Sequence, residues 1–257
     1  MSQFDYQEYY RRNLPHIQPP GATLFVTFRL DGSIPQAILD AWRSEKKQLE
    51  AERLRREAIS GVTLDPEVVA TENLTFQRRW FQKFEAQLHA EVAGPTWLKN
   101  AQVAAIVAEA LHHRDGKEYR LDAFCVMSNH VHVVFAPLLT EQVAGELADE
   151  IILRKKSGGG KTQIDSLRYP EKANATLAVI MQSLKGYTAW KCNVALERTG
   201  AFWQHESYDH VFRDEGEFGR VIRYVLDNPV KAGLVEQWQN WDWNYCRQTL
   251  LEAGELK

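Results

Sequence analysis

The stretch SNHVHVVF, residues 128–135, places two histidines two positions apart inside an otherwise apolar run. Successive side chains of a β-strand point to opposite faces of a sheet. His130 and His132 therefore share one face, while Val131 and Val133 share the other. The stretch predicts a buried strand with one apolar face and one face of imidazoles.

The segments before this strand supply its expected neighbours. Residues 119–127, YRLDAFCVM, are typical of a strand and are separated from the histidine strand only by Ser128 and Asn129. This spacing predicts a tight hairpin or one strand with a bend. Residues 23–30, TLFVTFRL, have the β-branched and aromatic content of a first core strand.

Helical patterns occupy much of the remaining chain. They span residues 38–58, 76–92, 101–113, 177–197 and 214–228. Long helices between non-adjacent strands, without a regular strand-helix-strand rhythm, predict an α+β fold with helices packed on an antiparallel sheet. We expect a single domain over residues 1–257, with a helical insertion at about 33–93 and a basic loop insertion at about 151–173.

The composition is that of an ordinary globular protein, with 44% hydrophobic and 25% charged residues among 257. Three scattered cysteines, Cys125, Cys192 and Cys246, argue against a disulfide framework and against a cysteine zinc site. They favour a reducing, cytoplasmic location. We expect no membrane span, because no apolar run approaches the length needed to cross a bilayer.

A basic segment over residues 154–191 contrasts with the net charge of −3 for the whole chain. It is a candidate contact surface for a polyanion, although charge runs are often only solvated faces. Lys185, Tyr187 and Lys191 could hold a nucleic-acid strand through phosphate contacts and stacking, or could simply pack. The SGGGKT run within this segment lacks the first glycine of a P-loop, because Lys155 stands there.

The paired histidines are the first candidates for chemistry. Two imidazoles on one buried face are costly without a shared purpose, and neutral imidazole is a common metal ligand. Tyr224 and Asn228 are four residues apart in a predicted helix and share one of its faces. An amide oxygen suits a hard divalent cation, and a hydroxyl there could meet a phosphate. Taken singly, Tyr224 is also an ordinary core residue, Asn228 an ordinary helix stop before proline, and Tyr187 a rival nucleophile.

Three motifs in order resemble the REP-associated tyrosine transposases, within the single-tyrosine, His-hydrophobic-His (HUH) transposases. They are FCVMSNHVHVVF (124–135), SLKGYTAWKCN (183–193) and FWQHESYDHVFRDEGEFGRVIRYVLDNPVKAGLV (202–235). With the first strand, the resemblance covers most of residues 23–235.

The resemblance implies a ferredoxin-like (RRM-like) antiparallel sheet with the histidines on a central strand. It places the nucleophile on Tyr224 and the ligands of a Mg²⁺ or Mn²⁺ ion on His130, His132 and Asn228. Many relatives outside the subgroup have glutamine as the third ligand, so asparagine is a departure that leaves the metal open. The family match also demotes Tyr187 as nucleophile.

The implied activity is cleavage and rejoining of single-stranded DNA at palindromic hairpin repeats through a 5′-phosphotyrosine. His205, His210 and Arg213 join the basic segment as candidate DNA contacts, with a structural role equally open for His210. The alternatives are a domesticated protein that binds palindromic DNA without cutting it and a metal-dependent phosphodiesterase that uses water. We expect a monomer or homodimer at the nucleoid, and the 33–93 helices have no assigned task.

Overall fold

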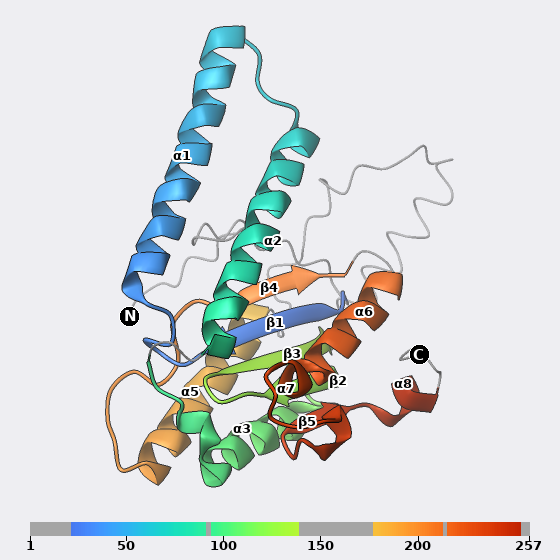
Figure 1. Cartoon of the computed structure of the whole chain (residues 1–257). Helices are drawn as coiled ribbons and strands as arrows, with labels where there is room; N and C mark the ends of the chain where they lie inside the picture. The colour runs from blue at the N-terminus through green and yellow to red at the C-terminus, as the bar shows by residue number, and fades with distance from the viewer. Residues whose placement is uncertain (1–21, 91–93, 139–176, 213–214, 253–257) are drawn as a thin grey trace, which may run out of the picture.

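The computed structural model describes residues 22–90, 94–138, 177–212 and 215–252. The predicted basic loop insertion at about 151–173 lies outside these residues. Within them, the chain folds as an antiparallel sheet with helices packed on it (Figure 1). The α+β fold class predicted from the sequence is confirmed.

Five strands form the sheet in the described part of the chain. They are β1 (Leu24–Arg29), β2 (Tyr119–Val126), β3 (His130–Pro137), β4 (Tyr208–Val211) and β5 (Asn244–Cys246). Their order is β4-β1-β3-β2-β5, and all neighbouring pairs are antiparallel. The order of the first four, with helical connections after β1 and after β3, is that of a ferredoxin-like sheet. The histidine strand β3 therefore lies between β1 and β2, at the centre.

β2 and β3 form a tight hairpin, so the alternative of one bent strand is wrong. Val126 lies opposite Val131, and the backbone N–H of Met127 donates to the carbonyl oxygen of His130 over 2.9 Å. The strand register thereby fixes which face each side chain of β3 meets.

Helices cover both faces of the sheet. On one face, α3 (Ala101–Arg114) and α5 (Leu177–Ala195) bury the alternate apolar residues of β1 and β3. On the other face, α6 (Glu215–Leu226) packs over a second core that includes Phe25, Cys125 and Val134. His130 and His132 lie on this second face and are removed from water, so their polar atoms need partners inside the protein.

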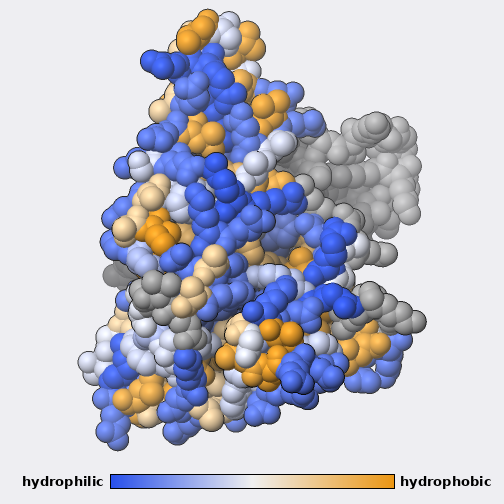
Figure 2. Space-filling model, in the orientation of Figure 1, coloured by the Kyte–Doolittle hydropathy of each residue, from blue (hydrophilic) through white to orange (hydrophobic). Residues whose placement is uncertain are grey.

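A long helical pair extends away from the sheet (Figure 1). It consists of α1 (Gln36–Ser60) and α2 (Pro66–Ala90), within the stretch predicted as a helical insertion. The pair has its own small core around Trp42, Phe76 and Trp80, separate from the two cores of the sheet. Figure 2 shows hydrophilic residues over most of its visible face. The last turns of α2 reach the sheet, where Phe81 packs against Phe25 of β1.

The end of α6 differs from the single helix predicted over residues 214–228. α6 ends at Leu226, and a short helix, α7 (Asn228–Lys231), follows directly. Pro229 has no N–H to continue the helical hydrogen bonds. The side-chain Nδ2 of Asn228 donates to the carbonyl oxygen of Tyr224, one residue earlier in the helix than the carbonyl that an N–H at position 229 would reach, over 3.0 Å. The remaining elements are η1 (Trp97–Lys99), η3 (Trp238–Asn240) and α8 (Gln248–Glu252).

Candidate functional site

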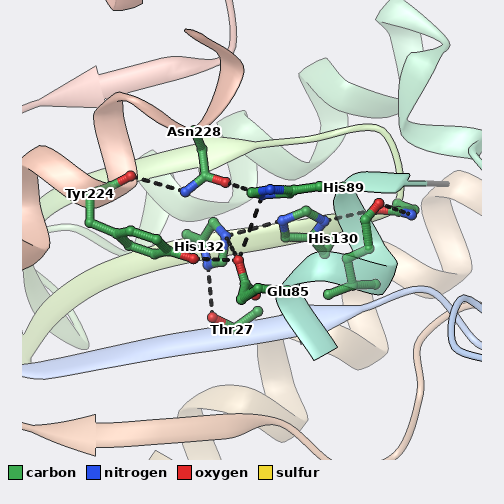
Figure 3. Close-up of polar contacts among 9 residues, drawn as sticks. Thr27, Glu85, His89, His130, His132, Tyr224 and Asn228 are labelled. Atoms are coloured by element: carbon green, nitrogen blue, oxygen red, sulfur yellow. Dashed lines mark hydrogen bonds and ion pairs between the residues drawn. The ribbon is translucent and has the colours of Figure 1, made fainter. Parts of the chain in front are cut away.

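The two histidines of β3 are almost completely buried, with 1% of His130 and 0% of His132 exposed. Their Nε2 atoms lie 3.0 Å apart. The strand alternation predicted from the sequence is confirmed, because Val131 and Val133 belong to the core on the opposite face. Two ring nitrogens thus point at each other in the second core of the sheet (Figure 3).

The other ring nitrogen of each histidine is held by a neighbouring side chain. The Nδ1 of His130 lies 2.7 Å from Oδ1 of Asn129, whose own Nδ2 donates to the carbonyl oxygen of Leu88. Because the Asn129 Nδ2 is held by Leu88, the Asn129 Oδ1 faces His130 and accepts the proton of its Nδ1. The Nε2 of His130 then carries a free lone pair. The Nδ1 of His132 lies 2.7 Å from Oγ1 of Thr27 on β1. Such partners orient imidazoles for metal binding.

Two residues of α2 complete the cluster, and neither was among the predicted site residues. Glu85 and His89 are four apart, so they lie on one face of the helix. Oε2 of Glu85 lies 3.3 Å from Nε2 of His132 and 3.7 Å from Nε2 of His89. Ligand atoms of Glu85, His89, His130 and His132 all lie within 4.8 Å of one another, so the cluster could hold a metal ion.

Tyr224 and Asn228 enter the same cluster from the end of α6 and the start of α7. The Tyr224 hydroxyl donates a hydrogen bond to Oε2 of Glu85. Oδ1 of Asn228 lies 2.6 Å from Nε2 of His89, which donates to it because the Asn228 amide group faces Tyr224. Figure 3 shows the side chains of Tyr224, His132 and His89 directed at Glu85, with Asn228 beside His89. The structure therefore brings the predicted ligands and the predicted nucleophile together.

The electrostatics of the cluster centre on Glu85, of which 7% is exposed. Burial alone raises the pKa of a carboxyl group, but attraction to His132 and hydrogen bonds from His132 and Tyr224 lower the pKa of Glu85 overall. Burial and the nearby His132 hold the pKa of His130 well below its usual value. Burial and the Glu85 carboxylate raise the pKa of Tyr224. Without a cation, Glu85 is charged, His130 is neutral and Tyr224 keeps its proton.

The donor set fits a divalent metal ion. Imidazole nitrogens bind such ions at about 2.0–2.1 Å, so two nitrogens on one ion lie roughly 3 Å apart, as the Nε2 atoms of His130 and His132 do. Oε1 of Glu85 is buried and has no hydrogen-bond partner among the described residues. A buried carboxylate with an unsatisfied oxygen is stabilised by a cation.

A hollow of about 230 Å³ lies at the edge of the cluster. Its lining includes His89 and His130, together with Leu88 of α2 and Met127 of the β2–β3 turn. Asn228 and His132 have no exposed surface, whereas Tyr224 is half-buried.

The candidate DNA-contact residues on α5 lie on the other side of the sheet from this cluster. Tyr187 and Trp190 are 45% and 61% exposed, and Nζ of Lys191 lies 5.4 Å from the centre of the Trp190 ring. Lys185 faces the chain before β4 instead. Its Nζ donates to the carbonyl oxygens of Gln204 and His205 over 2.6 and 2.8 Å. Tyr187 therefore lies on the opposite side of the sheet from the imidazole pair, whereas Tyr224 contacts Glu85 in their cluster.

The remaining candidates lie around β4. His205 is exposed, and its backbone carbonyl accepts the hydrogen bond from Lys185. Nε2 of His210 lies 2.9 Å from Oε1 of Glu217 on α6, which ties β4 to that helix. Arg213 lies outside the described residues.

All three cysteines are free thiols. In the part of the chain that the structure describes, no helix combines the length and the apolar character that crossing a membrane demands.

No family model matches the chain. An uncharacterized protein from Haemophilus influenzae is 30% identical over 117 residues, which make up 44% of this chain and 56% of that protein. A solved structure of a REP-associated tyrosine transposase bound to a REP hairpin aligns with 93% of this chain and 82% of its own, at 12% identity and a TM-score of 0.45.

Proposed function

We propose that the chain is a metal-assisted enzyme that cleaves and rejoins single-stranded DNA at hairpin-forming palindromic repeats. Tyr224 is its nucleophile, and His130, His132 and Asn228 hold one Mg²⁺ or Mn²⁺ ion. The observation that carries the proposal is the hydrogen bond from Tyr224 to Glu85, because the same carboxylate oxygen contacts His132. Phosphoryl transfer to tyrosine needs a phenol as nucleophile and a divalent ion beside it, and this cluster can supply both.

The chemistry follows from the placement of the side chains. A divalent ion held by His130, His132 and Asn228 would neutralise charge that develops on the scissile phosphate. The Tyr224 oxygen forms a bond to phosphorus while the bond from phosphorus to the 3′ oxygen breaks, which leaves a 5′-phosphotyrosine and a free 3′-hydroxyl. The phenolic proton passes by way of Glu85, which already accepts it in a hydrogen bond, to the leaving 3′ oxygen, which becomes the 3′-hydroxyl. Attack by another 3′-hydroxyl reverses these steps and joins two strands.

We infer that residues on α5 and around β4 contact the DNA strand. The candidate contacts are Lys185, Tyr187, Lys191, His205, His210 and Arg213. We place the activity on chromosomal DNA at the nucleoid, in a monomer or a homodimer.

A second candidate function is binding of palindromic DNA without cleavage. One observation favours it: α2 packs over the cluster, and the Tyr224 hydroxyl already donates a hydrogen bond to Glu85 of this helix. In such a protein the cluster stabilises the fold and never meets a phosphate. A covalent adduct between protein and DNA separates the two functions.

The test incubates the full chain with labelled hairpin-containing single-stranded DNA and Mn²⁺, and then denatures the mixture. Wild type is expected to retain label in a denaturation-resistant complex, and Tyr224→Phe is expected to lose it. Tyr245→Phe, at a partly buried tyrosine of β5 that packs against the core on the opposite face of the sheet, serves as the matched control and keeps the adduct. An adduct that persists in Tyr224→Phe overturns the assignment of the nucleophile, and an adduct undiminished in His130→Ala overturns the role of the metal.

A further inference from the structure

The α1–α2 pair, which the sequence left without a task, ends in the cluster. Glu85 lies one turn before His89 near the end of α2, and its Oε2 lies within 3.3 Å of His132. It is the one acidic residue of the group that could hold a metal among the described residues. The question is whether this carboxylate only borders the ion or binds it.

Charge favours direct binding. An imidazole that binds a metal ion is neutral, and the amide of Asn228 carries no net charge. A divalent ion held only by neutral groups in a site with almost no exposed surface is poorly compensated. The Glu85 carboxylate supplies the missing negative charge, and its Oε1 has no hydrogen-bond partner among the described residues.

The contacts of Asn228 point the same way. Its Nδ2 donates to the carbonyl oxygen of Tyr224, and its Oδ1 already accepts from Nε2 of His89 over 2.6 Å. Both ends of the amide are therefore engaged by protein groups. Glu85, in contrast, has one buried oxygen without a partner and another beside His132.

We propose that Glu85 of α2 is the anionic ligand of the metal site. Two histidines and one glutamate then bind the ion most strongly, and Asn228 contributes a weaker, neutral ligand. His89 then acts as a positioning residue that holds Oδ1 of Asn228 at the edge of the site. Two imidazoles and a carboxylate leave coordination positions open, as catalytic sites require. The inference rests on the proposed function for the use of the ion, but not for its binding.

This arrangement also gives the helical pair a purpose. The small core of α1 and α2 around Trp80 holds the helix that delivers Glu85. The predicted insertion is then part of the active site, because the metal ion binds residues from β3 and α2 together.

The experiment measures metal binding without DNA. Mn²⁺ is titrated calorimetrically into the metal-free full chain for wild type, Glu85→Gln, Asn228→Ala and Glu67→Gln. Glu67 is an exposed residue of the same helix, about 27 Å from Glu85 at roughly 1.5 Å per residue, so Glu67→Gln is the matched control.

Glu85→Gln is expected to weaken Mn²⁺ binding at least about 100-fold, since loss of an outer partner alone costs about 10- to 100-fold. Asn228→Ala is expected to weaken it less than Glu85→Gln, and Glu67→Gln not at all. Equal affinities of wild type and Glu85→Gln, or a greater loss in Asn228→Ala, overturn the proposal. If Glu85→Gln does not fold, Glu85→Asp decides: its shorter carboxylate is expected to bind Mn²⁺ more weakly, and unchanged affinity overturns the inference. A missing DNA adduct with this affinity pattern intact refutes only the proposed function.

Discussion

The hydrogen bond between Tyr224 and Glu85 makes a quantitative prediction for the metal-free protein. Tyr224→Phe removes the hydroxyl that donates to the buried carboxylate. The ring keeps its place, because its neighbours Phe25 and His132, with centroids 6.0 and 5.5 Å away, contact only its faces and edges. The substitution therefore changes a hydrogen bond and little apolar burial.

The size of the effect follows from the charge of the acceptor. Hydrogen bonds to charged groups contribute about 1.5–3 kcal/mol, and neutral ones about 0.5–1.5 kcal/mol. Oε1 of Glu85 has no partner among the described residues, so the carboxylate cannot easily replace the lost donor. We expect Tyr224→Phe to lower the free energy of unfolding by about 2 kcal/mol.

Tyr119→Phe is the matched comparison for this effect. The Tyr119 hydroxyl is also buried but donates to a neutral acceptor, the carbonyl oxygen of Leu111, over 2.8 Å. Its loss is expected to cost about 1 kcal/mol. Urea unfolding of the metal-free variants at pH 7 measures both. A loss in Tyr224→Phe no larger than that in Tyr119→Phe refutes the charged hydrogen bond.

Four further predictions concern the same cluster. The pKa of Glu85 is lowered from 4.5 to about 2. The charged carboxylate therefore stabilises the fold above about pH 4.5, and this stabilisation is lost as the pH falls toward 2. Acid unfolding curves should show this loss in wild type and not in Glu85→Gln. Asn129→Ala frees the ring of His130 and should weaken Mn²⁺ binding about 10- to 100-fold, measured by calorimetry against wild type; unchanged affinity contradicts it. Mn²⁺ should bind more tightly than Mg²⁺, which prefers all-oxygen sites, and competition titration with the reverse order would count against imidazole ligation. Trp80→Ala leaves a cavity in the core of the helical pair and should lower the free energy of unfolding by about 3–5 kcal/mol and weaken Mn²⁺ binding. A thermal melt and a calorimetric titration measure the two effects. Lost stability with unchanged Mn²⁺ affinity would show that this core does not support the metal site.

The part of the site that follows local rules could be predicted from the sequence. The alternation of β3 placed His130 and His132 on one face, and four-residue spacing brought Tyr224 and Asn228 together. The helical end was less predictable, because the side chain of Asn228 donates to the carbonyl oxygen of Tyr224 just before Pro229. Periodicity therefore gave the correct face but not the bounds of α6.

Glu85 and His89 could not be predicted, because their partners are distant in the chain and α2 carries many other charged residues. A glutamate and a histidine four residues apart were the available signal, but this spacing is common on surface helices. The start of α2 was also missed, although Asp65 accepts a hydrogen bond from the N–H of Glu67 at that end. The strand β5 is only three residues long and has no pattern of its own.

The most direct test of the central claim is to locate a covalent DNA linkage by mass spectrometry. The full chain is reacted with hairpin-containing single-stranded DNA and Mn²⁺, digested with protease and nuclease, and searched for a nucleotide-modified peptide. We predict a 5′-phosphate attached to the peptide that contains Tyr224. Modification of another residue, or cleaved DNA with an unmodified Tyr224 peptide and a free 5′-phosphate, would contradict the account.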